Sequence, residues 1–369
     1  MMKIPVSKPL FSGKELEYVT DCMKTGWVSS GGKYIEEFEN GFSKYLNAKH
    51  SITACNGTAA LHLALLSLGI EKGDEVILPN FTMIASANSI VYTGAKPVFV
   101  DVEPRTWNID VDKIEEKITK DTKAIMAVHI FGHPCDMDPI LKIANEHGIS
   151  VVEDAAESIG AEYKGKIVGC LGDVGAFSFY GNKIITTGEG GMVVTNNEET
   201  AERIKAFKNH WFDKDRTFIH KNIGFNYRMT NIQAAIGLAQ LENIEKHIKI
   251  KRDIVQTYNN LLKEVDGVRT PIEEKWAKSV FWMYAVLIQD SFGKDKDVVR
   301  KELEKLGVET RLLFAPMNSQ PSFAFLGDSN NYPVSEELYK RGFYLPSGLQ
   351  IDDKEIQYVA DSIKNIRLS

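Results

Sequence analysis

A single lysine, Lys183, stands where a surface lysine is not expected. It lies in the segment F-S-F-Y-G-N-K-I-I-T-T-G-E-G-G (residues 177–191), between two short apolar runs and ahead of glycine-rich backbone. Residues 174–179 and 192–195 read as buried strands, so Lys183 is predicted in an interior loop between them. A lysine there either extends its ammonium to solvent or has a lowered pKa suited to forming an imine with a carbonyl compound.

A second candidate is the turn formed by Asn56, Gly57 and Thr58. A short strand is predicted to end there, and an Ala/Leu-rich helix starts at once. The unpaired N–H groups and the positive end of that helix point out of the turn, which can therefore receive a phosphate. The alternative is an ordinary helix cap by Asn56 or Thr58 that binds no ligand.

The third candidate is a carboxylate, Asp154, which follows the apolar run at residues 149–152. Such a side chain either caps the segment that follows it or neutralises a buried cation. Asp154 precedes Lys183 by 29 residues (183 − 154), which leaves room for two adjacent strands whose ends share one crevice. Ser178 lies five residues before Lys183 and adds a hydroxyl.

These groups together match the needs of pyridoxal phosphate (PLP). Its aldehyde forms an imine with a lysine, and its pyridine nitrogen stays protonated against a carboxylate so that the ring can accept carbanion charge. Its phosphate is anchored by N–H and hydroxyl donors. Lys183, Asp154, Ser178 and the 56–58 turn supply one group for each of these requirements.

The elements that must position these residues alternate between strand and helix, which predicts a three-layer α/β domain with a largely parallel sheet. Ligands of such sheets bind beyond the carboxyl ends of the strands. We expect further strands at residues 75–78, 97–101, 124–130, 150–153 and 280–289, and helices at residues 14–24, 34–46, 84–92, 111–118, 139–147, 197–207, 231–262, 297–306 and 353–363. The predicted domains are a large cofactor-binding domain, residues 1–240, and a smaller C-terminal α/β domain, residues 241–369.

The composition narrows the function classes. The chain has 369 residues and a net charge of −6, which gives no support to a nucleic-acid or anionic-membrane surface. No apolar run approaches the length of about 20 residues that a membrane helix needs, so we predict a cytoplasmic protein. The four cysteines are widely spaced without a C-x-x-C pair, which argues against a zinc site or a disulfide framework, and no metal is expected.

The sequence resembles the DegT/StrS family of PLP-dependent sugar aminotransferases from I-P-V-S-K-P at residues 4–9 to L-P-S at residues 345–347. The blocks that carry the resemblance are C-N-G-T-A-A-L-H-L-A-L (55–65), H-I-F-G-H-P-C-D-M-D (129–138), E-D-A-A-E-S-I-G-A (153–161), the segment 177–191, and N-Y-R-M-T-N-I-Q-A-A-I-G-L-A-Q-L (226–241). The resemblance implies an aspartate-aminotransferase-like fold, with a large three-layer α/β/α domain and a smaller C-terminal α/β domain.

The resemblance also implies catalytic roles. Lys183 corresponds to the lysine that carries the cofactor, Asp154 to the aspartate at the pyridine nitrogen, and Glu157 to the residue that contacts the ring hydroxyl. Related dehydratases have histidine in place of the lysine, so Lys183 favours amino transfer over dehydration. The implied amino donor is glutamate, and the freed lysine then acts as general acid and base, with ping-pong kinetics.

Other positions of the family pattern face the cofactor phosphate and ring. The resemblance places Gly57, Thr58 and Ser178 at the phosphate and implies that Asn226 reaches it from the neighbouring subunit of a homodimer with shared active sites. Met83 stands where an aromatic residue usually stacks on the cofactor, so a thioether would pack there.

Within the family, the blocks are most similar to the enzymes that aminate C4 of GDP-4-keto-6-deoxymannose. This implies a nucleotide-linked 4-keto-6-deoxy sugar as acceptor and a role in lipopolysaccharide or capsule biosynthesis. Substrate-side positions would include Ser30, His210, Arg228 and Asn318. The sequence departs from that subgroup in three places. Met83 replaces an aromatic residue, K-N-H-W-F (208–212), which contains His210, replaces a glycine-containing loop, and Asn318 stands where histidine is common.

Those departures motivate an alternative acceptor, a smaller phosphorylated ketone such as a triose phosphate, used in capsule decoration. A cofactor-binding regulator without turnover is a third interpretation, which the intact Lys183, Asp154 and Ser178 disfavour. Arg228 and Arg311 could each hold a phosphate or carboxylate, or form structural salt bridges. The remaining notable side chains are interpreted as core or loop residues: His62, His129, His133 and Trp282.

Overall fold

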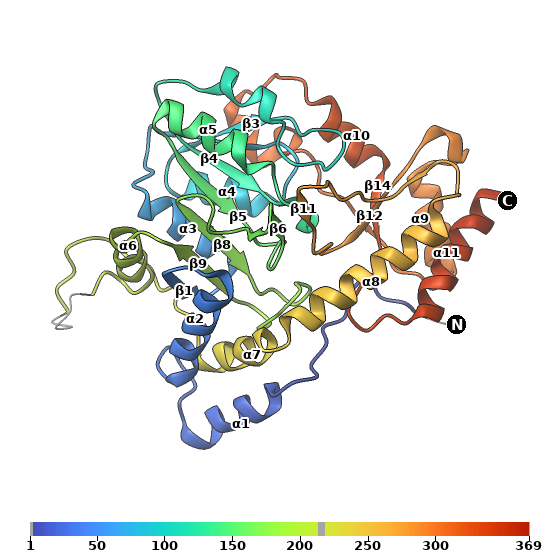
Figure 1. Ribbon diagram of the computed structural model, residues 1–369. Helices are drawn as coiled ribbons and strands as arrows, with labels where there is room; N and C mark the ends of the chain where they lie inside the picture. The colour runs from blue at the N-terminus through green and yellow to red at the C-terminus, as the bar shows by residue number, and fades with distance from the viewer. Residues whose placement is uncertain (1–2, 213–217, 369) are drawn as a thin grey trace.

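The computed structural model describes residues 3–212 and 218–368 (Figure 1). Its centre is a seven-stranded sheet in the order β1-β9-β8-β5-β4-β2-β3. Only β9 runs against its neighbours, β1 and β8, so the sheet is mostly parallel as predicted. The strands are β1 (His50–Ala54), β2 (Glu75–Pro79), β3 (Lys96–Val100), β4 (Thr122–Val128), β5 (Ser150–Asp154), β8 (Val174–Ser178) and β9 (Gly191–Thr195).

Helices cover both faces of this sheet, which makes three layers. One face packs against α3 (Gly57–Ser67), α4 (Ile84–Tyr92) and α6 (Glu198–Lys208), whose apolar residues share one core cluster with the strands. The other face packs against α2 (Lys33–Leu46), α5 (Met137–His147) and α7 (Asn231–Leu241). The expected α/β architecture is confirmed.

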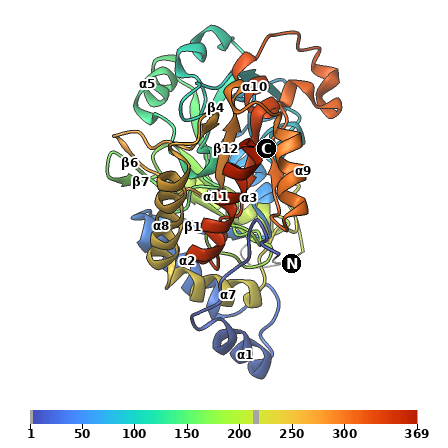
Figure 2. The same cartoon turned by 90° about the vertical axis from the view of Figure 1, so that its right-hand side faces the viewer.

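A second sheet, β10-β12-β14-β13, forms the smaller domain. Its strands are β10 (Val268–Arg269), β12 (Tyr284–Ile288), β13 (Arg311–Leu312) and β14 (Gly342–Leu345), and its helices are α8 (Ile244–Leu262), α9 (Lys296–Lys305) and α11 (Asp353–Leu368). Figure 2 shows α8 and α11 side by side. The helix α8 contributes apolar residues to the cores of both domains and so connects them. The predicted boundary between residues 240 and 241 stays a prediction.

Short elements complete the chain. A small third sheet pairs β6 (Glu162–Tyr163) with both β7 (Lys166–Ile167) and β11 (Ala277–Lys278). The other helices are α1 (Glu15–Thr25) and α10 (Pro333–Arg341), together with short 3₁₀ turns that include η5 (Met317–Ser319). The loop predicted between residues 208 and 221 lies partly outside the described residues, which omit 213–217.

Two predicted helices are wrong in detail. The expected helix at 231–262 is interrupted at Asn243, whose φ of −112° and ψ of 8° separate α7 from α8. Its amide side chain donates to the Ala239 carbonyl at 3.1 Å, an end-of-helix contact that the continuous apolar pattern does not reveal. The segment 111–118 forms two 3₁₀ turns, because the Asp110 carboxylate accepts from the Asp112 N–H and begins a short turn.

Within the described ranges, none of the helices combines the length and the apolar character needed to cross a membrane. The same residues contain no group of three His, Cys, Asp or Glu side chains placed to hold a metal ion.

One buried charge lies in α8. The Lys251 side chain is buried and its Nζ donates to the Ser347 carbonyl at 2.5 Å. Burial lowers the pKa of Lys251 to about 7, because a carbonyl stabilises an ammonium less than water does. Between pH 7 and the ordinary lysine pKa, the unfolded chain therefore binds one more proton at this site than the folded chain does.

We predict that this group makes the free energy of unfolding rise with pH from about 7 towards 10, by at most about 1.4 kcal/mol per pH unit. Lys251→Met should remove this contribution, which chemical denaturation of wild type and variant at several pH values would measure. The control is Lys249→Met, since Lys249 lies on the same helix but is exposed and pairs with Asp253. Identical slopes for wild type and Lys251→Met would contradict the assignment.

Candidate active site

The candidate site lies at the carboxyl ends of β5 and β8. These strands are parallel neighbours, with Asp154 in register with Ala176, so the last residue of each emerges on the same edge of the sheet. The chain then loops from Ser178 back to β9, and Lys183 lies in that loop, where its N–H donates to the Tyr180 carbonyl at 2.9 Å. The predicted loop position of Lys183 is confirmed.

The Lys183 side chain is only 10% exposed, and its Nζ lies 3.8 Å from Oε1 of Glu157. Burial lowers the pKa of Lys183, against the opposing effect of the negative charges of Glu157 and Asp154. Burial raises the pKa of Glu157 to about 7, although the Lys183 charge works in the other direction. The protonation of each group therefore depends on the charge of the other.

Asp154 is held from two sides. Its Oδ2 accepts from the Ser86 hydroxyl at 2.7 Å, and its Oδ1 accepts from the Ala156 N–H at 3.1 Å. Burial raises the pKa of Asp154, while the Ser86 hydrogen bond is the largest effect that lowers it. The side chain is thus a fixed, buried carboxylate that would favour a protonated partner.

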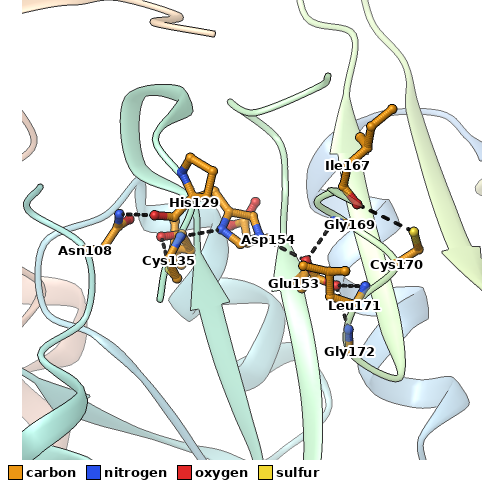
Figure 3. Close-up of polar contacts among 12 residues, drawn as sticks. Asn108, His129, Cys135, Glu153, Asp154, Ile167, Gly169, Cys170, Leu171 and Gly172 are labelled. Carbon is orange, nitrogen blue, oxygen red and sulfur yellow. Dashed lines mark hydrogen bonds and ion pairs between the residues drawn. The ribbon is translucent and has the colours of Figure 1, made fainter. Parts of the chain in front are cut away.

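Behind Asp154, the preceding residue Glu153 is completely buried on the opposite face of the strand (Figure 3). Its carboxylate accepts from His129 Nε2 at 3.1 Å, and His129 Nδ1 accepts from the Cys135 N–H at 3.0 Å, which places the imidazole proton on Nε2. Three backbone N–H groups also donate to the Glu153 carboxylate at 2.6–2.7 Å, those of Gly169, Leu171 and Gly172. This network fixes the end of β5. The interpretation of His129 as a core residue is confirmed. The supporting role of Glu153 was not predicted from the sequence.

The predicted phosphate turn contacts the end of β8 at Ser178. The Asn56 side chain caps α3 by accepting from the Ala59 N–H at 2.8 Å, as one of the two interpretations expected. The first helical bond runs from the Ala60 N–H to the Asn56 carbonyl, so the N–H groups of Gly57 and Thr58 precede it. A Cβ on Gly57 would lie 2.7 Å from Cβ of Ser178, so the two residues are in direct contact.

These groups fit PLP by their chemistry and placement. A buried amine follows β8, a fixed buried carboxylate ends β5, and a helix N-terminus contacts Ser178 at the end of β8. The glycine in that turn leaves space that a side chain would fill. When bound, PLP supplies an electron-accepting ring that carries the amino group between donor and acceptor.

The sequence matches the DegT/DnrJ/EryC1/StrS aminotransferase family over residues 10–364. The protein belongs to this family. It is an aminotransferase, and its cofactor is PLP. The resemblance on which the site residues were assigned is therefore confirmed at the level of the family.

Curated relatives cover almost the whole chain of this DegT-family protein. GDP-perosamine synthase from Caulobacter vibrioides is 46% identical over 365 residues, which cover 99% of this chain and 98% of the relative. GDP-perosamine synthase from Escherichia coli O157:H7 is 45% identical, with 98% of each chain covered.

Solved structures of the family have the same fold. A Streptococcus pneumoniae protein in its PLP form has a TM-score of 0.94 at 27% identity, covering 100% of this chain and 99% of that chain. Helicobacter pylori PseC, an aminotransferase involved in the biosynthesis of pseudoaminic acid, has a TM-score of 0.93 at 27% identity, covering 99% of each chain.

The predicted substrate-side residues of this DegT-family member lie on several different segments of the chain. Met83 is 47% exposed at the start of α4, three residues before the Asp154 partner Ser86. Asn318 in η5 forms two hydrogen bonds with Asn80, both at 2.9 Å. The side-chain NH₂ of Asn80 donates to Asn318 Oδ1, and the backbone N–H of Asn318 donates to Asn80 Oδ1. Ser30 is exposed.

Asn226 and Arg228 form a separate group. The Arg228 guanidinium donates to Asn226 Oδ1 through Nε and Nη2 at 3.0 and 2.7 Å, and to Asn209 Oδ1 at 2.8 Å. His210, the residue after Asn209, has a positive φ of 55°. Across residues 3–212 and 218–368, no hydrogen bond or ion pair joins this group to Lys183, Asp154 or Glu157.

Trp282 is the functional neighbour that the sequence did not reveal. It is buried, as a core residue should be, but its ring centroid lies 3.6 Å from Lys183 Nζ. Its indole N–H donates to the carbonyl of Asn182, the residue just before the lysine, at 2.8 Å. The only signal in the sequence was a tryptophan before a strand, which is typical of any core.

The contact between Gly57 and Ser178 gives a test of the phosphate turn. We predict that Gly57→Ala weakens PLP binding about 10- to 100-fold, because overpacking costs about 1–3 kcal/mol and moves the turn away from Ser178. Equilibrium titration of the cofactor-free protein with PLP measures this. Gly181→Ala is the control, since a Cβ on Gly181 meets nothing within 4 Å. Equal affinities for wild type and Gly57→Ala would place the phosphate elsewhere.

Proposed function

We propose that the protein transfers an amino group from glutamate to C4 of a nucleotide-linked 4-keto-6-deoxy sugar, with GDP-4-keto-6-deoxymannose as the first candidate. The observation that carries this proposal is the likeness to GDP-perosamine synthases at 45–46% identity over 98–99% of the chain. The product would serve surface polysaccharide biosynthesis.

In this proposal Lys183 is the general acid and base. Burial lowers its pKa, which makes the amine easier to deprotonate, so Nζ can both take and return a proton. The carboxylate of Glu157, 3.8 Å away, compensates the charge that Nζ acquires when it is protonated. Asp154 would face the ring nitrogen of PLP and keep it protonated, held in place by Ser86.

The remaining cofactor contacts are proposed from the turn and from a second subunit. The N–H groups of Gly57 and Thr58 and the hydroxyl of Ser178 would bind the phosphate. Asn226 would complete this site in the partner subunit of a homodimer, with its side chain oriented by Arg228.

The acceptor would bind beyond the carboxyl ends of β5 and β8. Met83 would pack against the cofactor ring with its thioether, and Ser30, His210, Arg228 and Asn318 would contact the substrate. The pairing of Asn318 with Asn80 fixes where its side chain can present a polar group.

The direct test supplies the purified PLP enzyme with glutamate and GDP-4-keto-6-deoxymannose and detects the amino sugar nucleotide by mass spectrometry. We predict formation of the product, and a loss of at least about 10²–10⁴-fold in Lys183→Ala, because the general acid and base is removed. Lys183→Ala should also lack the absorbance of the covalently held cofactor.

Two outcomes would contradict parts of this proposal. Conversion of glutamate without any amino sugar would reject the sugar nucleotide, and a panel of smaller phosphorylated ketones would then identify the acceptor. Turnover retained by Lys183→Ala would reject the role of the lysine itself.

The shared site gives a second test. Lys183→Ala and Asn226→Ala are each expected to lose activity, but a mixed dimer would carry one intact site and one doubly altered site if Asn226 acts across the interface. We predict that mixing the two variants under subunit exchange restores turnover. Native mass spectrometry would verify the mixed dimer, and a mixed dimer without activity would place Asn226 in its own subunit's site or outside both.

A further inference from the structure

The segment 279–283, which leads into β12, lies against the turn that follows β4. The Val280 N–H donates to the Gly132 carbonyl at 3.1 Å, and the Trp282 N–H donates to the Phe131 carbonyl at 2.8 Å. The Ser279 hydroxyl adds a third bond to the Gly132 carbonyl at 3.0 Å. Two segments far apart in the sequence are thus joined as one backbone unit.

This unit holds unusual backbone conformations on both sides. Phe131 has a φ of 51° and Phe281 a φ of 48°, values in the left-handed region that bulky residues rarely adopt. Gly132, with a φ of 90°, permits the close approach, since a Cβ there would lie 2.7 Å from Val280 Cγ2 and 3.0 Å from the Trp282 nitrogen. Strain of this kind persists where the surrounding structure fixes it, and it concentrates at functional sites.

The unit fixes both neighbours of the Lys183 amine. From one side, the Phe131 N–H donates to Glu157 Oε2 at 2.8 Å and orients the carboxylate whose other oxygen faces Nζ. From the other side, Trp282 presents its ring face to Nζ at 3.6 Å. The indole plane is itself fixed, because its N–H is bound to the Asn182 carbonyl and its ring stacks on Phe131.

We propose that Trp282 is a positioning residue for amino transfer, whose ring face holds the free ε-ammonium of Lys183 at the place from which it exchanges a proton. This inference rests on the proposed function of Lys183. The aromatic face attracts a cation most strongly when water is excluded, as it is here. The contact therefore offsets part of the desolvation of the ammonium and also restricts where the flexible lysine chain can place it.

The test changes the electronics of the ring without changing its shape. Tryptophan analogues with one to four ring fluorines, inserted at position 282 of the full-length protein, withdraw charge from the ring face in steps. The amine of Lys183 must be unprotonated to react with PLP, so the rate of PLP uptake by cofactor-free protein, followed by absorbance against pH, reports its pKa. We expect the inflection to fall progressively, by about one pH unit for the fully fluorinated ring.

The other titratable groups facing the amine stay the same in this series. They are Glu157 and Asp154, with the Tyr344 phenol beyond Glu157. The same analogues at Trp276 are the matched control, because that ring packs on His133 and Tyr163 instead of Lys183. Trp282→Phe, which keeps a ring but loses the bond to Asn182, should shift the inflection less than full fluorination.

An inflection that does not move across the fluorinated series at Trp282 would overturn the inference, as would an equal shift at Trp276. Failure of the proposed role of Lys183 is distinguishable, because the absorbance of the covalently held cofactor would then persist in Lys183→Ala, whatever the ring at position 282. A purely structural role of Trp282 would leave the inflection in place, since the fluorinated rings preserve packing.

Discussion

The burial of one amine beside two carboxylates is the constraint on which the rest of the structure depends. Taking Lys183, Asp154 and Glu157 out of water is costly, and the cost is tolerated only where each group finds specific partners. Hydroxyl and backbone donors serve the two carboxylates, and an aromatic face serves the amine. Because the groups are coupled, a change in the protonation of one alters the others.

The supporting layer is built to keep those partners still. Both oxygens of the Glu153 carboxylate accept hydrogen bonds, from three backbone N–H groups and from His129. The strand that ends in Asp154 therefore cannot shift without breaking four hydrogen bonds. Such preorganisation reduces the movement required when charge develops during a reaction. The fixed position of Asp154 is thus a property of the large sheet.

Much of this arrangement could be predicted from the sequence, for a physical reason. Parallel strands end on one edge, so Asp154 and Lys183 were expected to meet, and a strand followed at once by a helix predicted the turn at Gly57. The contacts of Trp282 could not be predicted, because its partner Asn182 is 100 residues away and no periodic pattern encodes such a pairing. The break at Asn243 was missed because the apolar pattern continues on both sides of it.

The pairing of residues 277–282 has a mechanical consequence. Although this stretch follows α8 in the chain, β11 pairs with β6, and Val280 and Trp282 pair with the turn after β4. Backbone hydrogen bonds therefore tie the stretch to the large domain. Rotation of the smaller domain would require bending at several places, among them α8, the segment between β10 and β11, and the chain after Trp282. Domain closure around a bulky substrate would then leave Glu157 and Trp282 in place beside Lys183, because the turn after β4 holds both of them, whereas Tyr344 on β14 would move relative to them.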